Sequence, residues 1–312
     1  TILSRLYRLW AVIVLVRIVP WVATWADPAL LAGMPGRGAE DGAFATSVDI
    51  EYCRLHGIPL TLGVTDLHKC FDRICRALLY LLLTIGGFPP GILRAYKAYH
   101  EGLRYRFALR QSLGEEHTRA LGIPQGCPLS MVFVAFFLLP LLSLMKSLGA
   151  AALLLADYIL ITVEGSVCCS VFITAFDAAL TFFHMIGAVI ALSKSYVTST
   201  VVAQRRELAK VRWGPQGAPI LVVTHARDLG AHFCTSLQCI APTTTKRIIE
   251  SADQSGTLAR RCAHPELKCQ VLLAKQILKA LYSGHFTHVS HFALRKLQSA
   301  FARVVGPCDT NR

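Results

Sequence analysis

A stiff loop rich in glycine and proline, with an aspartate at the end of an apolar run on each side of it, constrains the fold of this 312-residue chain most strongly. The loop is Gly-Ile-Pro-Gln-Gly-Cys-Pro-Leu-Ser, residues 122–130. Asp66 follows the apolar run 60–65, and Asp157 follows the run 151–155 after one alanine. Short apolar runs bounded by turn residues predict strands, so we expect both carboxylates at strand ends beside the loop. Two such carboxylates can hold divalent cations for phosphoryl transfer.

The remaining segments alternate between helix-type and strand-type patterns. The patterns predict helices at 1–25, 43–56, 71–85, 131–148 and 167–186, and further strands at 159–163, 221–224 and 229–233. A β-hairpin is predicted from 104–109 and 118–121, joined by a polar turn at 114–116, and it leads into the loop. This order indicates an α+β fold in which helices back one face of an antiparallel sheet.

The net charge of +13 is concentrated in the last third of the chain. Residues 1–203 carry 16 Lys and Arg against 13 Asp and Glu, whereas residues 204–312 carry 16 against 6. A basic region attached to a nearly neutral, apolar body indicates a polyanionic partner, with nucleic acid ahead of a membrane surface. A basic face that is simply solvated is the alternative.

The cysteines and the apolar runs bear on location. None of the eleven cysteines forms a Cys-x-x-Cys pair, which favours reduced thiols in an intracellular protein of the nucleus or cytoplasm over a secreted protein. The first helix is interrupted by arginines and is neither a signal peptide nor a spanning helix. The run 167–192 is long enough to cross a membrane, but Asp177 and Gly187 argue against a crossing, and no stable membrane association is expected.

Together these motifs resemble reverse transcriptases, RNA-directed DNA polymerases of the non-LTR retrotransposon and group II intron type. The resemblance covers residues 1–235 and implies a right-hand polymerase, with partial fingers in 1–60, a palm with a fingers insertion in 61–235, and a basic, mainly helical thumb-like region in 236–312. It is carried by residues 66–72, 122–130, 155–158 and 187–194, by 227–230 as the primer-grip hairpin, and by the Gly/Arg-rich segment 36–41.

The resemblance also implies roles for single residues. Asp66, Asp157 and the backbone carbonyl of Leu67 would bind Mg²⁺, with Mn²⁺ as a substitute. Phe71 would lie beneath the incoming sugar, and Lys194 would assist the departing pyrophosphate as a cation or an acid. The implied partners are an RNA template, a DNA primer and dNTPs.

The loop would face the nucleotide or the template. Gln125 can hydrogen-bond a base, sugar or phosphate, Pro124 fixes the path of the backbone, and Gly126 allows a ligand to approach closely. Each of these residues also has a plainer interpretation. A lone aspartate at a strand end is a common turn residue, Phe71 could anchor the next helix, and Lys194 could be merely solvated.

Two departures from the family pattern predict impaired activity. Tyr158 stands where reverse transcriptases usually carry a second adjacent aspartate, and the basic fingers residue that meets the triphosphate would lie before Thr1. Two alternatives therefore stay open. One is a non-catalytic remnant that binds nucleic acid through its basic C-terminal region. The weaker one is a polytopic membrane protein built from the runs 77–85, 132–145 and 167–192.

Overall fold

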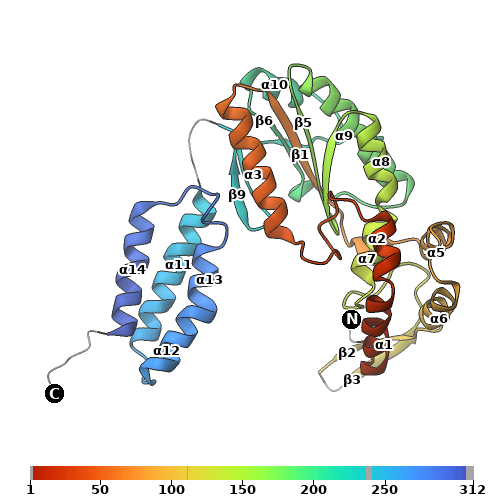
Figure 1. Cartoon of the computed structure of the whole chain (residues 1–312), viewed down its shortest axis with the longest axis horizontal. Helices are drawn as coiled ribbons and strands as arrows, with labels where there is room; N and C mark the ends of the chain where they lie inside the picture. The colour runs from red at the N-terminus through yellow and green to blue at the C-terminus, as the bar shows by residue number, and fades with distance from the viewer. Residues whose placement is uncertain (1–2, 111, 237–240, 307–312) are drawn as a thin grey trace. The chain divides into compact units, whose positions relative to one another are not determined.

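The chain divides into two units, each made from two separate stretches of sequence (Figure 1). A computed structural model describes residues 3–110, 112–236 and 241–306. Unit 1 comprises residues 1–38 and 59–222, and unit 2 comprises 39–58 and 223–312. This division does not test the predicted partition into fingers, palm and thumb, which stays a prediction.

A five-stranded sheet in the order β4-β5-β1-β6-β7 forms the centre of unit 1. Its strands β4, β5, β1 and β6 pair antiparallel, and β7 adds to β6 in parallel. The α+β prediction is therefore confirmed, although the sheet is not antiparallel throughout. The strands are β1 (Leu60–Asp66), β4 (Ala151–Leu155), β5 (Tyr158–Glu164), β6 (Tyr196–Ser199) and β7 (Leu221–Val222).

Helix α9 (Cys168–Met185) packs against β1 and β5 (Figure 1). Its fully buried Phe172 and Phe176 approach the central strand at Gly63, where an added Cβ would lie only 2.6 and 2.8 Å from their rings. Any side chain at this position would push the helix away from the sheet. The glycine in β1 therefore sets the close packing of helix on sheet.

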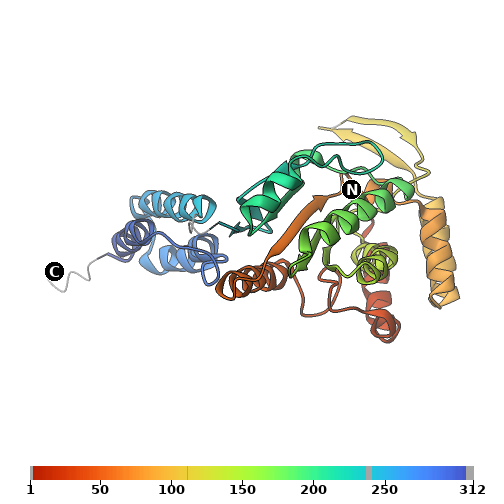
Figure 2. The ribbon, with the colours of Figure 1, turned by 90° about the horizontal axis from the view of Figure 1, so that it is seen from above.

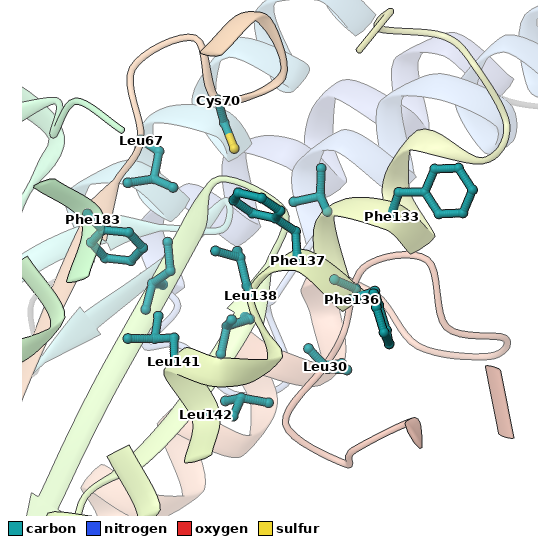
Figure 3. Packing of buried hydrophobic residues seen from close by; sticks show 14 of the residues in the cluster. Leu30, Leu67, Cys70, Phe133, Phe136, Phe137, Leu138, Leu141, Leu142 and Phe183 are labelled. Atoms are coloured by element: carbon teal, nitrogen blue, oxygen red, sulfur yellow. The ribbon is translucent and has the colours of Figure 1, made fainter. Parts of the chain in front are cut away.

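A second layer of the core surrounds α7 (Ser130–Phe137) and α8 (Leu139–Ser147) (Figure 3). Phe137 and Leu138 lie on the side of Leu67 and Cys70, the segment that follows β1. Phe136 lies on another side, with its ring 4.9 Å from Trp21 and 5.0 Å from Trp25 between centroids. The segment after β1 is thus fixed by packing as well as by the sheet.

Two apolar helical stretches, Ser130–Ser147 and Cys168–Met185, have the length and composition of membrane spans. The helices α1 (Arg5–Arg17) and α2 (Val19–Trp25) would together count as a third if the 55° bend between them were a break within one span. In the folded protein, 61% and 44% of the two windows are buried. Packing inside unit 1 accounts for much of the apolar character of these helices.

The other elements of unit 1 surround this core, and the β2–β3 hairpin projects from it (Figure 2). The hairpin consists of β2 (Tyr105–Leu109) and β3 (Ser112–His117). The helices are α1 (Arg5–Arg17), α2 (Val19–Trp25), α4 (Cys70–Arg73), α5 (Arg76–Ile85), α6 (Pro90–Glu101), the 3₁₀ helix η1 (Leu192–Lys194) and α10 (Val202–Leu208).

Unit 2 combines a hairpin with helices. Helices α11 and α14 share a core of small and aliphatic residues, among them Ala252, Ala293 and Leu297. Arg247 of α11 donates hydrogen bonds to the carbonyls of Gly230 and Tyr282, which ties the hairpin to the helices. The elements are α3 (Ala39–Leu55), β8 (His225–Asp228), β9 (Ala231–Cys234), α11 (Pro242–Ala259), α12 (Pro265–Val271), the π-helix η2 (Leu272–Ile277), α13 (Leu278–Leu281) and α14 (His291–Val305).

Several predicted elements need correction. The second strand of the hairpin runs over 112–117 and not 118–121, so residues 114–116 lie in a strand and not in a turn. The predicted helix 71–85 is broken at Ile74 and Cys75, whose backbones are extended. The predicted helix 131–148 is broken at Leu138, because Pro140 cannot donate to the preceding turn. The strand β6 and the helices α6 and α10 were not predicted.

Candidate active site

The two aspartates lie at adjacent strand ends of the sheet. Asp66 is the last residue of β1, and Asp157 lies in the tight turn between β4 and β5, where Ala156 has a φ of 57°. Tyr158 is paired directly opposite Asp66, and the amide of Leu67 donates a 2.9 Å hydrogen bond to the carbonyl of Asp157. The strand ends that carry the two carboxylates are thus joined by backbone pairing.

Lys194 approaches the first aspartate from the end of η1. Its Nζ lies 3.2 and 3.3 Å from the two carboxylate oxygens of Asp66. The amide of Ala191 donates a 2.8 Å hydrogen bond to the carbonyl of Asp66, which fixes this segment beside β1. The Lys194 side chain is 65% exposed and that of Asp66 is 19% exposed, so the ion pair lies at the opening of the site.

The loop 122–130 is attached to the segment that follows Asp66. The amides of Gly122 and Ile123 donate 2.8 Å hydrogen bonds to the carbonyls of Ile74 and Phe71. Gly122 has a φ of 87°, and an added Cβ would lie 2.8 Å from the backbone oxygen of Asp72. Only glycine satisfies both conditions, and the break between α4 and α5 exposes the Ile74 carbonyl that accepts this bond.

The inner side of the loop is held by a buried polar cluster. Cys127 Sγ lies 3.1 Å from the hydroxyl of Tyr7, which is also 3.0 Å from Nε2 of His100. Burial lowers the pKa of His100 to about 4, with a further contribution from Arg76. The imidazole is therefore neutral at physiological pH, and it supports the loop as a hydrogen-bonding group and not as a cation.

These elements enclose a pocket of about 860 Å³, which we call the aspartate pocket. Of the site residues predicted from sequence, Pro124 is the one that does not line it. The carbonyl of Pro124 instead accepts a 3.0 Å hydrogen bond from the hydroxyl of Ser130 within the loop. The lining residues are Asp66, Leu67, His68, Lys69, Cys70, Phe71, Gln125, Gly126, Cys127, Pro128, Ser130, Met131, Asp157 and Lys194.

Several residues that line the pocket had no role predicted from the sequence. Among them, Lys69 adds a positive charge. Its backbone is left-handed, with a φ of 52°, and turns the chain directly after Asp66 and Leu67. Its position within the 66–72 motif was the available signal. Asp72 of the same motif does not line the pocket and forms a 3.0 Å ion pair with Arg119.

The two carboxylates interact electrostatically. Burial raises the pKa of Asp157, the negative charge of Asp66 raises it further, and Lys194 opposes the rise. Burial also raises the pKa of the Cys70 thiol to about 12, with contributions from Asp157 and Asp66. Both carboxylates line the aspartate pocket, so a cation bound there would stabilise their ionised forms.

The donor atoms suit a hard divalent cation. Magnesium is commonly held by one or two carboxylates together with substrate phosphates and water. Asp66, Asp157 and the carbonyl of Leu67 are oxygen donors of this kind. Within residues 3–110, 112–236 and 241–306, His, Cys, Asp and Glu side chains form no group of three or more that could hold a metal ion. These donors would fit a divalent cation that takes its remaining ligands from a substrate and from water.

No protein-family model matches the chain, and no curated protein matches it in sequence. Solved structures do match. Apo telomerase from Candida tropicalis has a TM-score of 0.54 and 11% identity, over 96% of this chain and 49% of that chain. The same telomerase truncated from its C-terminal domain has a TM-score of 0.51 and 12% identity, over 73% and 44% of the two chains. Its complex with a TWJ fragment of telomeric RNA has a TM-score of 0.50 and 12% identity, over 95% and 51%.

This chain spans about half the length of the telomerase chains that it matches. At this identity the likeness concerns the fold, and the telomerases named here do not support the retrotransposon or group II intron type in particular. The catalytic subunit of telomerase is a reverse transcriptase. The chain therefore has a reverse-transcriptase-like fold.

Proposed function

We propose that this chain is the polymerase region of an RNA-directed DNA polymerase that adds dNTPs to a primer 3′-hydroxyl. The observation that carries this proposal is the arrangement of Asp66, Asp157 and Lys194 around the aspartate pocket, opposite the loop 122–130. The reverse-transcriptase-like fold supports the reaction class. The motifs in the sequence support a retroelement origin, of the non-LTR or group II intron type, and an intracellular location.

In this proposal Asp66, Asp157 and the Leu67 carbonyl hold magnesium, which when bound stabilises negative charge on the transferred phosphate. Lys194 forms an ion pair with Asp66 in the free protein, which supports a role for its exposed ammonium group in neutralising or protonating the departing pyrophosphate. Phe71 lies beneath the sugar and disfavours a 2′-hydroxyl. Gln125 and Gly126 contact the nucleotide or the template.

Tyr158 limits the activity of this site in the proposal. Its side chain is buried at the first position of β5, opposite Asp66, and it supplies no carboxylate there. Magnesium would therefore bind with two protein carboxylates and depend more on the phosphates of the nucleotide. We expect weak metal binding in the absence of nucleotide and slow synthesis.

A primer-extension assay tests the function. The purified chain is incubated with a DNA primer annealed to an RNA template, the four dNTPs, and magnesium or manganese. We expect the wild type to extend the primer and Asp66→Asn to abolish extension. Asp72→Asn should preserve it, because Asp72 does not line the pocket and forms a surface ion pair with Arg119. Extension that persists in Asp66→Asn would contradict the assignment of the site.

A non-catalytic nucleic-acid-binding protein of the same fold is the second candidate. Tyr158 favours it, because the fold can persist without the second aspartate. One matched telomerase structure is a complex with telomeric RNA, which supports a nucleic-acid partner for this fold. This candidate predicts RNA or DNA binding that weakens steeply with salt, with no extension in either metal.

The membrane-protein alternative is favoured only by the length and composition of the apolar helices. We propose no stable membrane association, because α9 packs against the sheet and the residues around α7 and α8 form its second core layer. Extraction of the expressed chain from membranes with alkaline carbonate tests this. Firm retention would support the alternative.

A further inference from the structure

Gln125 and Gly126 reach the aspartate pocket from a tight turn within the loop 122–130. The amide of Cys127 donates a 3.2 Å hydrogen bond to the carbonyl of Pro124, which closes this turn. Gly126 has a φ of 90°, a positive value of the kind that the third position of a type II turn requires. Gln125 and Gly126 are exposed, whereas Pro124 and Cys127 on either side of them are buried. We call residues 124–127 the loop turn.

The buried end of the loop turn contacts helix α1. The hydroxyl of Tyr7 lies 3.1 Å from Sγ of Cys127 and 3.0 Å from Nε2 of His100, and all three residues are buried. A hydroxyl can donate one hydrogen bond and accept others, so it can bridge the thiol and the imidazole at once. Burial raises the pKa of Tyr7, with a contribution from Cys127, so the hydroxyl keeps its proton. Tyr7 therefore links the loop turn to α1 and α6.

The position of this hydroxyl is set by contacts that do not involve it. The ring of Tyr7 is stacked on Tyr99, with centroids 3.7 Å apart and planes 7° from parallel. The amide of Tyr7 donates a 3.2 Å hydrogen bond to the hydroxyl of Ser4 at the start of α1. The carbonyl of His100 accepts a 3.2 Å hydrogen bond from the buried guanidinium of Arg76. A phenylalanine at position 7 would thus keep the packing and lose the bridge.

The bridge attaches the loop at a different point from its backbone hydrogen bonds. The amides of Gly122 and Ile123 fix the start of the loop to the segment after Asp66, and the hydroxyl of Ser130 bonds within the loop. Tyr7 contacts the loop turn itself, from a helix 120 positions away in the sequence. Loss of the bridge should loosen the turn while the start of the loop stays in place.

We propose that Tyr7 is a positioning residue, whose hydroxyl fixes the loop turn and thereby the placement of Gln125 and Gly126 against the incoming nucleotide. The inference rests on the proposed function for what the turn contacts, but not for the bridge between Tyr7 and Cys127. A group that only positions a binding loop should affect nucleotide affinity more than the rate of the chemical step.

Hydrogen exchange measures the bridge without any catalysis. Mass spectrometry with fragmentation follows the amide of Cys127, which closes the loop turn, in the purified wild type and in Tyr7→Phe. We expect exchange at this amide to be faster in Tyr7→Phe by about five- to tenfold, the factor expected of one lost hydrogen bond. Amides of α9, which packs on the sheet, should exchange as in the wild type and so exclude a general loss of stability.

Tyr96→Phe is the matched control. Tyr96 is 0% exposed and its ring lies 4.1 Å from that of His100 between centroids. Its hydroxyl has no hydrogen-bond partner among the residues that the structure describes. Tyr96→Phe therefore removes a hydroxyl from the same part of the core without breaking a bridge. It should leave exchange in the loop turn unchanged.

Steady-state primer extension tests the consequence for the reaction. Tyr7→Phe should raise KM for dNTPs by about tenfold and change kcat by less than about twofold, because the turn binds and the aspartates react. Cys127→Ala should also raise KM, and the double variant should be no worse than the more impaired single variant, since both changes remove one contact. Tyr96→Phe should keep the KM of the wild type.

The failure of this inference is distinguishable from failure of the proposed function. A wild type that extends no primer contradicts the function, and hydrogen exchange still tests the bridge. Equal exchange at Cys127 in the wild type and Tyr7→Phe would overturn the positioning role. So would a kcat that falls while KM is unchanged, or effects of Tyr7→Phe and Cys127→Ala on KM that multiply in the double variant.

Discussion

The Nζ of Lys194 lies 3.2 Å from the carboxylate of Asp66, at the opening of the aspartate pocket. The two residues are 128 positions apart in the sequence. They are brought together because η1 follows a segment whose backbone is hydrogen-bonded to β1 and to the residues after it. The contact distinguishes a lysine placed at the site from one that is merely solvated near a strand.

Lys194→Met tests that distinction. The ion pair is largely exposed, so its loss should change the free energy of unfolding by less than about 1 kcal/mol. If the ammonium group acts on the leaving pyrophosphate, primer extension should fall by about 100-fold. Lys146→Met, which breaks an exposed ion pair with Asp27, is the matched control and should leave extension unchanged. Equal rates of primer extension in Lys194→Met and Lys146→Met would show that the ammonium group of Lys194 takes no part in the reaction.

Tyr158→Asp tests the origin of the impairment. The substitution places a carboxylate opposite Asp66 and should increase extension in magnesium by tenfold or more. Without a cation, the buried carboxylate should destabilise the protein by about 1–3 kcal/mol, and magnesium with a nucleotide should restore part of that loss. Tyr158→Phe is the control and should not gain activity. A Tyr158→Asp variant that is folded but no more active than the wild type would show that Tyr158 is not the cause of the impaired extension.

Gly122→Ala tests the attachment of the loop to the segment after Asp66. The added Cβ would meet the Asp72 backbone and occupy an unfavourable φ of 87°, so we expect a loss of about 1–3 kcal/mol in unfolding free energy. Gly91→Ala is the control. Gly91 lies in helix α6 with nothing within 4 Å of an added Cβ, so that alanine should be neutral or stabilising by up to about 1 kcal/mol. Chemical denaturation measures both.

The raised pKa of Asp157 predicts how stability depends on pH. A carboxyl group whose pKa is higher in the folded state than in the unfolded state contributes stability below its ordinary value of 3.8 and loses it as pH rises through the folded value. At pH 7 without divalent cations, Asp157→Asn should therefore be more stable than the wild type. The stability advantage of Asp157→Asn should shrink as pH falls toward 3.8.

Thermal denaturation of the wild type and Asp157→Asn between pH 3.5 and 7.5 measures this dependence. Magnesium with a nucleotide should reduce the difference at pH 7, because the cation stabilises the ionised carboxylate. If the wild type is more stable than Asp157→Asn at pH 7 without metal, the ionised Asp157 carboxylate does not destabilise the folded protein, which would contradict the prediction.

The elements best predicted from the sequence were those with a continuous buried apolar run. The strands β1, β4 and β5 and the helix α9 were predicted because their apolar runs are bounded by turn residues. The positions of Asp66 and Asp157 at strand ends followed from those runs. The loop 122–130 could also be placed near them, because its glycines and prolines exclude regular structure.

Other features depend on contacts that the sequence pattern does not contain. The four-residue strand β6 is polar in part and becomes a strand because it pairs with β1. The hairpin strand β3 is exposed along almost its whole length, so no apolar alternation marks it. The break at Ile74 leaves a carbonyl that accepts a hydrogen bond from the amide of Gly122. In all three cases, pairing between separate segments decides the structure.

Manganese binding tests the central claim most directly, because the account requires Asp66 and Asp157 to form one cation site. Electron paramagnetic resonance can count free Mn²⁺ during titration of the chain with a non-hydrolysable dNTP analogue present. We predict that Asp66→Asn and Asp157→Asn each weaken Mn²⁺ binding by at least tenfold, whereas Asp72→Asn binds like the wild type. Unchanged binding in both Asp66→Asn and Asp157→Asn would contradict the account.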